Sequence, residues 1–180
     1  RAIMFRLITM IILIEIALSQ SAMSEILSPN GYVHFYGAVV SGSCSIDTQS
    51  LDQSVIMGQV PTSTFSAPGS WAEPIAFWIK LENCDSTVSQ TASVAFMGLT
   101  DQKDPQVFHA GMGSGSASGV GIGIFDTNDK LVVPNTIPLS ATAIHDGGNT
   151  LFFSARYRTV SLPVNAGDAS AAVTFSVVYQ

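Results

Sequence analysis

Charge is scarce in this sequence, and basic charge is the scarcest. Lysine and arginine together number 7 among 180 residues, against 13 aspartates and glutamates, which leaves a net charge of −6 at pH 7. The basic residues are scattered along the chain, so they form no stripe that could follow a phosphate backbone. The sequence therefore predicts a protein that has no nucleic-acid partner.

Metal-binding and nucleophilic residues are equally sparse. The chain has 3 histidines and 2 cysteines, and none of His34, His109 and His145 lies at metal-ligand spacing from a cysteine. Serine is abundant, yet there is no G-x-S-x-G motif, and no histidine has a sequence context that marks it as a catalytic base. We therefore expect no catalytic site, no metal, no cofactor and no small-molecule substrate.

Two stretches that could suggest chemistry have simpler interpretations. The glycine cluster in residues 111–126 lacks the preceding strand and following helix of a dinucleotide-binding fingerprint. A strand follows it instead, which favours a surface loop leading into that strand. Asp101 and Asp104 could act as an acid–base pair or hold a cation, but a polar turn before Pro105 is the simpler interpretation.

The chain also lacks an uninterrupted apolar run of the roughly 20 residues that span a bilayer. Its most apolar stretch is LITMIILIEIAL, which is about 12 residues long and contains Glu15. Arg1 and Arg6 precede this stretch and SQSA follows it, which is the layout of a secretory signal peptide. The sequence predicts a signal peptide at residues 1–21, cleaved after Ser21, with a retained signal anchor as the alternative.

Export bears directly on the two cysteines, Cys44 and Cys84. In an oxidising compartment nothing keeps thiols reduced, so a single pair of cysteines most simply forms a disulfide. In the chain-entropy model, closing a loop of this size removes about 4 kcal/mol of unfolded-state entropy. A metal site is the rival interpretation, and we predict the disulfide.

The rest of the sequence alternates between short apolar segments and clusters of glycine, proline, asparagine, aspartate and serine. The apolar segments are rich in β-branched and aromatic residues, and no stretch has the period of an amphipathic helix. Turn signals about every ten to fifteen residues are typical of a β-sandwich or a barrel. Strands are expected at residues 32–40, 54–60, 75–84, 92–98, 119–126, 130–134, 150–160 and 171–180.

An alternating pattern marks both ends of the predicted mature chain. Side chains of one parity lie on one face of a strand. From the residues alone, the favoured interpretation is that both ends are ordinary strands of one complete sandwich. The residues of shared parity are Leu27, Gly31, Val33 and Phe35 near the start, and Val173, Phe175, Val177 and Tyr179 at the end.

Together with the cysteine pair, these ends give the sequence a resemblance to a known family. It resembles the pilin subunits of chaperone–usher fimbriae, and type 1 fimbrial subunits in particular. The resemblance rests on GYVHFYGAVVSGSCSID around the first cysteine, MGQV after it, ENCD around the second cysteine and FSARYR before the last strand. A tyrosine next to last and a glycine ahead of the final strand also match, here Tyr179 and Gly167.

The resemblance implies an all-β fold, an incomplete immunoglobulin-like β-sandwich that a donor strand from another chain completes. In that family, the groove beside the C-terminal strand holds first a strand of a periplasmic chaperone and then the N-terminal extension of another subunit. The implied organisation is a signal peptide at residues 1–21, a donor-strand extension at residues 22–39 and a pilin domain at residues 40–180.

The resemblance also assigns roles to particular residues. In the donor strand, Leu27, Val33 and Phe35 would fill pockets of another subunit's groove, and Gly31 would let the two backbones approach closely. Residues that would face this chain's own groove, or the core behind it, and contact the chaperone are Gly167, Val173, Phe175, Val177 and Tyr179.

The function expected from the resemblance is that of a structural subunit of a type 1-like chaperone–usher fimbria that contributes to bacterial adhesion. Such a subunit has no enzymatic activity and is exported through the periplasm to the cell surface. Its expected partners are a periplasmic chaperone, an outer-membrane usher and neighbouring fimbrial subunits. The stretches VAFMGLTDQKDPQVFHAGMGSGSASGVGIGIFD and VVPNTIPL favour a minor, fimbrin-like subunit. The alternatives are a major rod subunit and a carbohydrate-binding adhesin module.

Overall fold

The computed structural model describes His34, Val39 and residues 42–180. In this part of the chain the fold is almost entirely β. Helical structure is limited to α2 (Thr48–Leu51) and the 3-10 turn η1 (Thr62–Thr64). The prediction of an all-β fold is confirmed. None of the helices described is long and apolar enough to cross a membrane.

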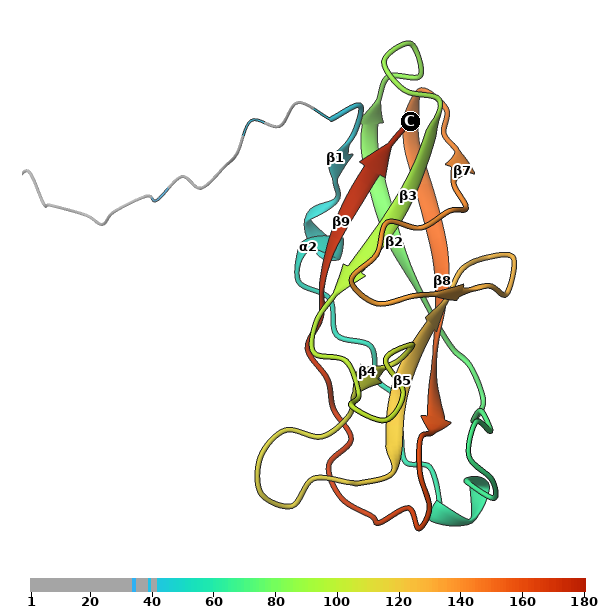
Figure 1. The fold of residues 1–180 in the computed structure, drawn as a ribbon. Helices are drawn as coiled ribbons and strands as arrows, with labels where there is room; N and C mark the ends of the chain where they lie inside the picture. The colour runs from blue at the N-terminus through green and yellow to red at the C-terminus, as the bar shows by residue number, and fades with distance from the viewer. Residues whose placement is uncertain (1–33, 35–38, 40–41) are drawn as a thin grey trace, which may run out of the picture. The chain divides into compact units, whose positions relative to one another are not determined.

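The strands form two sheets (Figure 1). All pairs within the larger sheet are antiparallel, and the pair β2–β8 lies near its centre. The larger sheet has the order β1 (Ser45–Ile46), β2 (Ile75–Cys84), β8 (Gly147–Thr159), β5 (Val120–Phe125) and β4 (Phe108–His109), and β6 (Leu131–Val132) pairs with β5.

The smaller sheet has the order β7 (Thr142–Ala143), β3 (Thr91–Met97) and β9 (Thr174–Tyr179). β9 pairs with β3 in antiparallel register along its whole length. No other described strand pairs with β9. The last strand of the chain is therefore an edge strand, with one row of backbone groups left for another partner.

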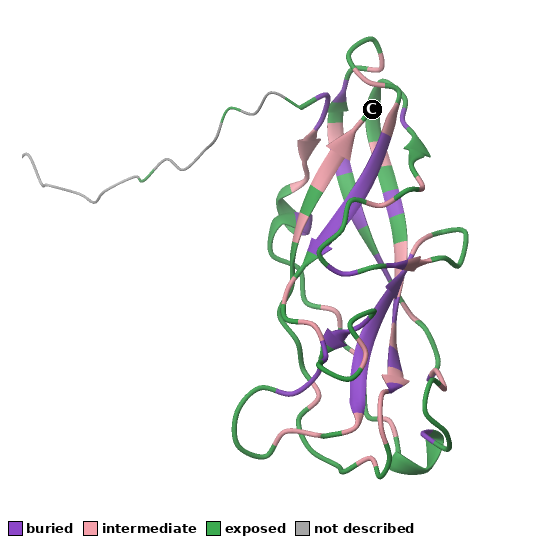
Figure 2. Cartoon of the chain, viewed as in Figure 1, coloured by how far each residue is buried: buried purple, intermediate pink, exposed green. Residues whose placement is uncertain are grey.

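The core lies between the two sheets, and β2 shows the alternation of buried and exposed side chains expected of a strand with one face in the core. In β2, Phe77 and Ile79 are buried, whereas Trp78 and Lys80 point away from the core and are exposed. Phe96 of β3 meets Phe77 from the other sheet, with ring centroids 6.1 Å apart. Every residue of β5 is buried (Figure 2), so this strand is covered on both faces.

The disulfide between Cys44 and Cys84 is present, as predicted. Cys44 directly precedes β1 and Cys84 ends β2, so the bond reinforces the pairing of these two strands. Among the described residues there is no free cysteine.

Most predicted strands are found, with shifted ends. Those at residues 75–84, 92–98, 119–126, 130–134 and 150–160 correspond to β2, β3, β5, β6 and β8. The final strand begins at Thr174 and not at residue 171. The two-residue strands β1, β4 and β7 were not predicted, because two residues cannot display a period of two. The strand expected at residues 32–40 falls outside the described residues, apart from His34 and Val39.

The prediction for residues 54–60 is wrong. These residues are not assigned to a strand, and no backbone hydrogen bond joins them to the rest of the described chain. Gly58 interrupts the segment with a φ of +69°, a value that suits glycine and not a pleated strand. The apolar pattern is real, but a strand also needs a neighbouring strand, and the described residues supply none at this place.

Candidate functional site

A large groove lies along residues 54–60, the segment that pairs with no strand of the described chain. Its volume is about 1230 Å³. One wall is formed by residues 50–62, and the other by residues 164–173 together with Phe175 of β9. The floor is the interior of the sandwich itself, and its large side chains include Phe77, Ile79, Phe96, Phe108, Ile122 and Tyr157.

The two walls of the groove are not bonded to each other. Residues 54–60 make no backbone hydrogen bond within the described chain, and β9 uses only the edge that faces β3. Unpaired backbone groups next to apolar surface are costly unless water or another chain satisfies them. The arrangement is that of a sheet from which one strand is missing, and an added extended peptide could bond to both walls.

The first wall keeps part of the apolar pattern that the sequence displays. Val55, Met57 and Val60 are half-buried against the core, whereas Ile56 points outward with 79% of its surface exposed. This wall was predicted as an ordinary strand, and its place beside a groove was missed. The signal available in the sequence was the combination of strand-like alternation with Gly58 at the centre of the segment.

The second wall is held by the glycine-rich loop that precedes β5. A Cβ atom added to Gly167 would lie 2.5 Å from the backbone nitrogen of Ala117 and 2.5 Å from the carbonyl oxygen of Gly115. This close approach lets Ala117 N–H donate to the carbonyl of Asp168 at 2.7 Å, while Asp168 N–H donates to the carbonyl of Gly115 at 3.0 Å. Gly167 thus lines the groove, and because it has no side chain, the loop of residues 115–117 can pack directly against it.

The C-terminal residues that the sequence grouped together divide into two sets. Val173 and Phe175 line the groove. Val177 and Tyr179 are not among the residues that line it, and they are half-buried against the core, as Phe175 also is.

Tyr179 ties the end of the chain to the segment before β1. Its hydroxyl donates to the carbonyl of Cys44 at 3.3 Å. A Cβ atom added to Gly42 would lie 2.8 Å from the Tyr179 ring. Burial raises the pKa of the Tyr179 hydroxyl, and the bond to Cys44 opposes that rise. The next-to-last tyrosine therefore anchors the start of the described domain.

The predicted donor residues Leu27, Gly31, Val33 and Phe35 lie outside the described residues, as does the predicted signal peptide at residues 1–21. Their roles stay predictions.

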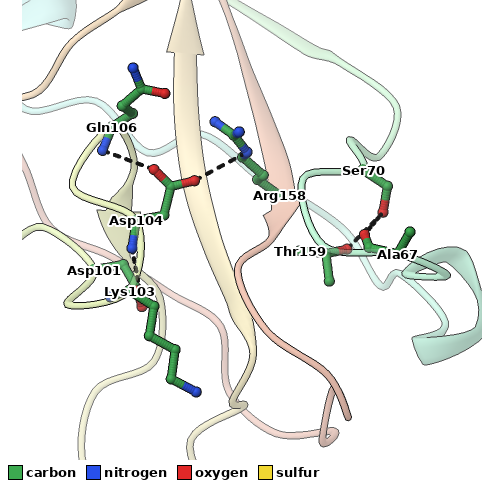
Figure 3. A network of polar contacts seen from close by, with 8 residues as sticks. All are labelled: Ala67, Ser70, Asp101, Lys103, Asp104, Gln106, Arg158 and Thr159. Carbon is green, nitrogen blue, oxygen red and sulfur yellow. Dashed lines mark hydrogen bonds and ion pairs between the residues drawn. The ribbon is translucent and has the colours of Figure 1, made fainter.

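The stretch around Asp101 and Asp104 is a polar turn, as the simpler interpretation held (Figure 3). The Asp101 carboxylate accepts from the backbone N–H groups of Lys103 at 2.8 Å and Asp104 at 3.2 Å. Asp104 in turn lies 3.2 Å from the Nε atom of Arg158. Both carboxylates are thus occupied by contacts within the domain. Within the described residues, no group of three or more histidine, cysteine, aspartate or glutamate side chains is placed to hold a metal ion.

Comparison with known proteins agrees with this geometry. The sequence model of the family described as "Fimbrial protein" matches residues 33–180. The putative fimbrin-like protein FimI of Salmonella typhi is 37% identical over 171 residues, which is 94% of each chain. The type-1 fimbrial protein A chain of Escherichia coli is 36% identical over 180 residues, covering 96% of this chain and 97% of that protein.

A solved structure gives the same result for the fold. A chaperone–usher pilus, studied for the molecular basis of rod uncoiling, matches with a TM-score of 0.70 at 30% identity, covering 84% of this chain and 96% of that chain. The present chain belongs to the fimbrial protein family. It is an exported fimbrial subunit of the chaperone–usher kind, with an all-β, immunoglobulin-like pilin fold, and it is a structural protein and not an enzyme.

Proposed function

We propose that this subunit polymerises by strand exchange. Its groove accepts an extended strand from another chain, and its own residues 22–39 enter the groove of a neighbouring subunit. The observation that carries the proposal is the open groove of about 1230 Å³ between two walls that lack a strand between them. An inserted strand would bond to the free edge of β9 and cover the exposed floor of the core.

The energetics of the donor strand support this proposal. If Leu27, Val33 and Phe35 each became buried at ~1.5 to 3 kcal/mol, the gain would be about 5 to 9 kcal/mol. That gain is comparable with the whole stability of a typical domain. A subunit with an empty groove is therefore expected to be only marginally stable, and contact with its neighbour supplies much of its folding free energy.

The same reasoning defines the partners that we propose. Before assembly, a periplasmic chaperone would protect the groove by lending a strand, because an exposed apolar groove and a free strand edge invite aggregation. An outer-membrane usher would then bring subunits together, and a neighbouring subunit would replace the chaperone strand. All three are the kinds of partner that membership of a chaperone–usher pilus implies.

The test is thermal unfolding of a chain of residues 40–180, alone and with a synthetic peptide of residues 24–39. We expect the chain alone to unfold at a low temperature with a broad transition, and the peptide to raise the midpoint by tens of degrees, about as expected for several kcal/mol in a domain of this size. A peptide carrying Phe35→Ala is the matched control and should give a clearly smaller rise. A sharp transition for the chain alone, with no shift on adding the peptide, would mean that the sandwich is already complete.

The position of the subunit in the fibre is a finer question. We propose the minor, fimbrin-like role, supported by the 37% identity to a fimbrin-like protein over 94% of both chains. The alternative is a major rod subunit. Immunogold labelling of intact fimbriae distinguishes them, because label along the whole filament would indicate a major subunit, and sparse label at defined positions a minor one.

A further inference from the structure

The groove carries charge of one sign. Among the residues that line it in the described part of the chain, Asp52 and Asp168 are the only charged ones, and the lining includes no lysine, arginine or histidine. Both aspartates are exposed. The hydroxyl of Ser170 donates to the Asp168 carboxylate at 2.7 Å and lowers the pKa of that carboxyl below its ordinary 3.8. The groove is therefore acidic at neutral pH.

The two aspartates lie near opposite ends of the groove. Asp52 directly follows α2, which is bonded to β2 because the Ser50 hydroxyl accepts from Lys80 N–H at 3.0 Å. Asp168 is bonded instead to the loop that leads into β5, through the carbonyl of Gly115. Figure 1 shows α2 beside β1, and the connection from β8 to β9 at the other end of the domain. A strand bound along the groove would therefore have an aspartate near each of its ends.

The extension of this same chain also carries acidic charge. Residues 22–39 contain Glu25 and no lysine or arginine. Glu25 has the parity of Leu27 and Phe35, which are predicted to point into a groove, so in one continuous strand its carboxylate would point there too. It precedes all the predicted donor residues, so it would lie at one end of the bound strand and near one of the two aspartates, whichever way that strand runs. Like charges brought together in an interface disfavour the pairing.

We propose that the groove selects its donor strand by charge, and that it prefers the extension of a different fimbrial subunit, with lysine or arginine in place of Glu25, to the extension of a second copy. A basic side chain there replaces repulsion by attraction to a groove aspartate. The inference rests on the proposed strand exchange and adds which extension the groove prefers. It agrees with the proposed minor role, because a subunit that disfavours its own extension does not favour long runs of identical copies.

The test is a competition between synthetic peptides of residues 22–39, with acetylated N-termini, for the chain of residues 22–180. Glu25→Gln removes a charge that would face the groove. Ser24→Lys is the matched control, because it changes the net charge of the peptide by the same amount but has the opposite parity and would point away from the groove. Equimolar pairs of peptides are added in excess, and mass spectrometry of the isolated complexes gives the ratio bound.

We expect Glu25→Gln to be preferred over the parent peptide about two- to fivefold at low salt, and Glu25→Lys more strongly, since partly exposed charges interact only modestly. Ser24→Lys should be bound about as well as the parent peptide. In 1 M salt, where the Debye length is about 3 Å, the preference for Glu25→Gln should disappear. An equal preference for Glu25→Gln and Ser24→Lys would overturn the inference.

Variants of the groove then locate the effect. Asp52→Asn and Asp168→Asn keep the shape of each side chain and remove its charge, so a chain carrying both should bind the parent and Glu25→Gln peptides equally. A preference that survives in this chain would contradict charge selection by the groove. Peptide binding itself is read from the rise in the unfolding midpoint. If no peptide binds, strand exchange fails and this inference fails with it, whereas binding without discrimination refutes charge selection alone.

Discussion

Gly167→Ala tests how the second wall of the groove is built. The added Cβ would lie 2.5 Å from backbone atoms of Gly115, Ser116 and Ala117. Backbone cannot rotate away as the end of a side chain can, so the wall and the loop must separate. Separation weakens the bonds from Ala117 N–H to Asp168 and from Asp168 N–H to Gly115.

The expected cost follows from those two bonds. A typical intramolecular hydrogen bond contributes about 0.5 to 1.5 kcal/mol net, so losing both costs about 1 to 3 kcal/mol. Replacing glycine also restricts the unfolded chain, which stabilises the fold by about 0.4 to 1 kcal/mol. Gly148→Ala shares this second effect but meets only the carbonyl of Leu81, at 3.9 Å, so it is the matched control.

The assay is urea unfolding of each variant as a chain of residues 40–180, with the peptide of residues 24–39 bound in its groove. We expect Gly167→Ala to be less stable than Gly148→Ala by about 1 to 3 kcal/mol, and to bind the peptide more weakly because the wall has moved. If the two variants unfold within about 0.5 kcal/mol of each other, the loop does not hold the wall and the reasoning is wrong.

Two further predictions concern the ends of β2 and β8. Reducing the Cys44–Cys84 disulfide should lower the free energy of unfolding by about 4 kcal/mol, measured by urea unfolding with and without reductant; an unchanged midpoint would contradict the loop-entropy argument. The backbone N–H and hydroxyl of Ser86 both donate to Asp146, at 2.8 and 2.7 Å, and they hold the pKa of that carboxyl below its ordinary 3.8. These bonds stabilise the fold at a pH above the unfolded pKa of Asp146, and that stability is lost as the pH falls through the folded pKa. Between about pH 5 and pH 2, Asp146→Asn should therefore lose less of its free energy of unfolding than the parent chain does. An equal loss in the variant would refute this.

Local patterns in the sequence were sufficient for much of the fold. The alternation in residues 75–84 predicts β2, because Phe77, Ile79 and Leu81 must share a buried face and Lys80 must point to solvent. The lone cysteine pair predicts the disulfide, because an exported chain with two thiols has no competing partner for either. Both predictions depend only on residue type and spacing along a short stretch.

The groove could not be predicted in the same way. Residues 54–60 carry the apolar pattern of a strand, and pattern alone cannot reveal whether another strand lies beside them. The role of Gly167 depends on its close approach to Gly115, Ser116 and Ala117, which lie far earlier in the chain, and sequence spacing does not disclose this contact. Val173 and Phe175 line the groove, whereas Phe175, Val177 and Tyr179 pack against the core, and parity alone does not say which of the two each residue does.

The sequence by itself determined the class of fold, the disulfide and, through its resemblance to fimbrial subunits, the kind of protein. Each of these follows from local periodicity, composition or short motifs. Only the tertiary structure decided which edges remain unpaired, where the core stays open and which glycine admits a neighbouring loop. The physical reason is that pairing, burial and close approach are relations between segments distant along the chain, and these relations exist only once the two sheets have packed together.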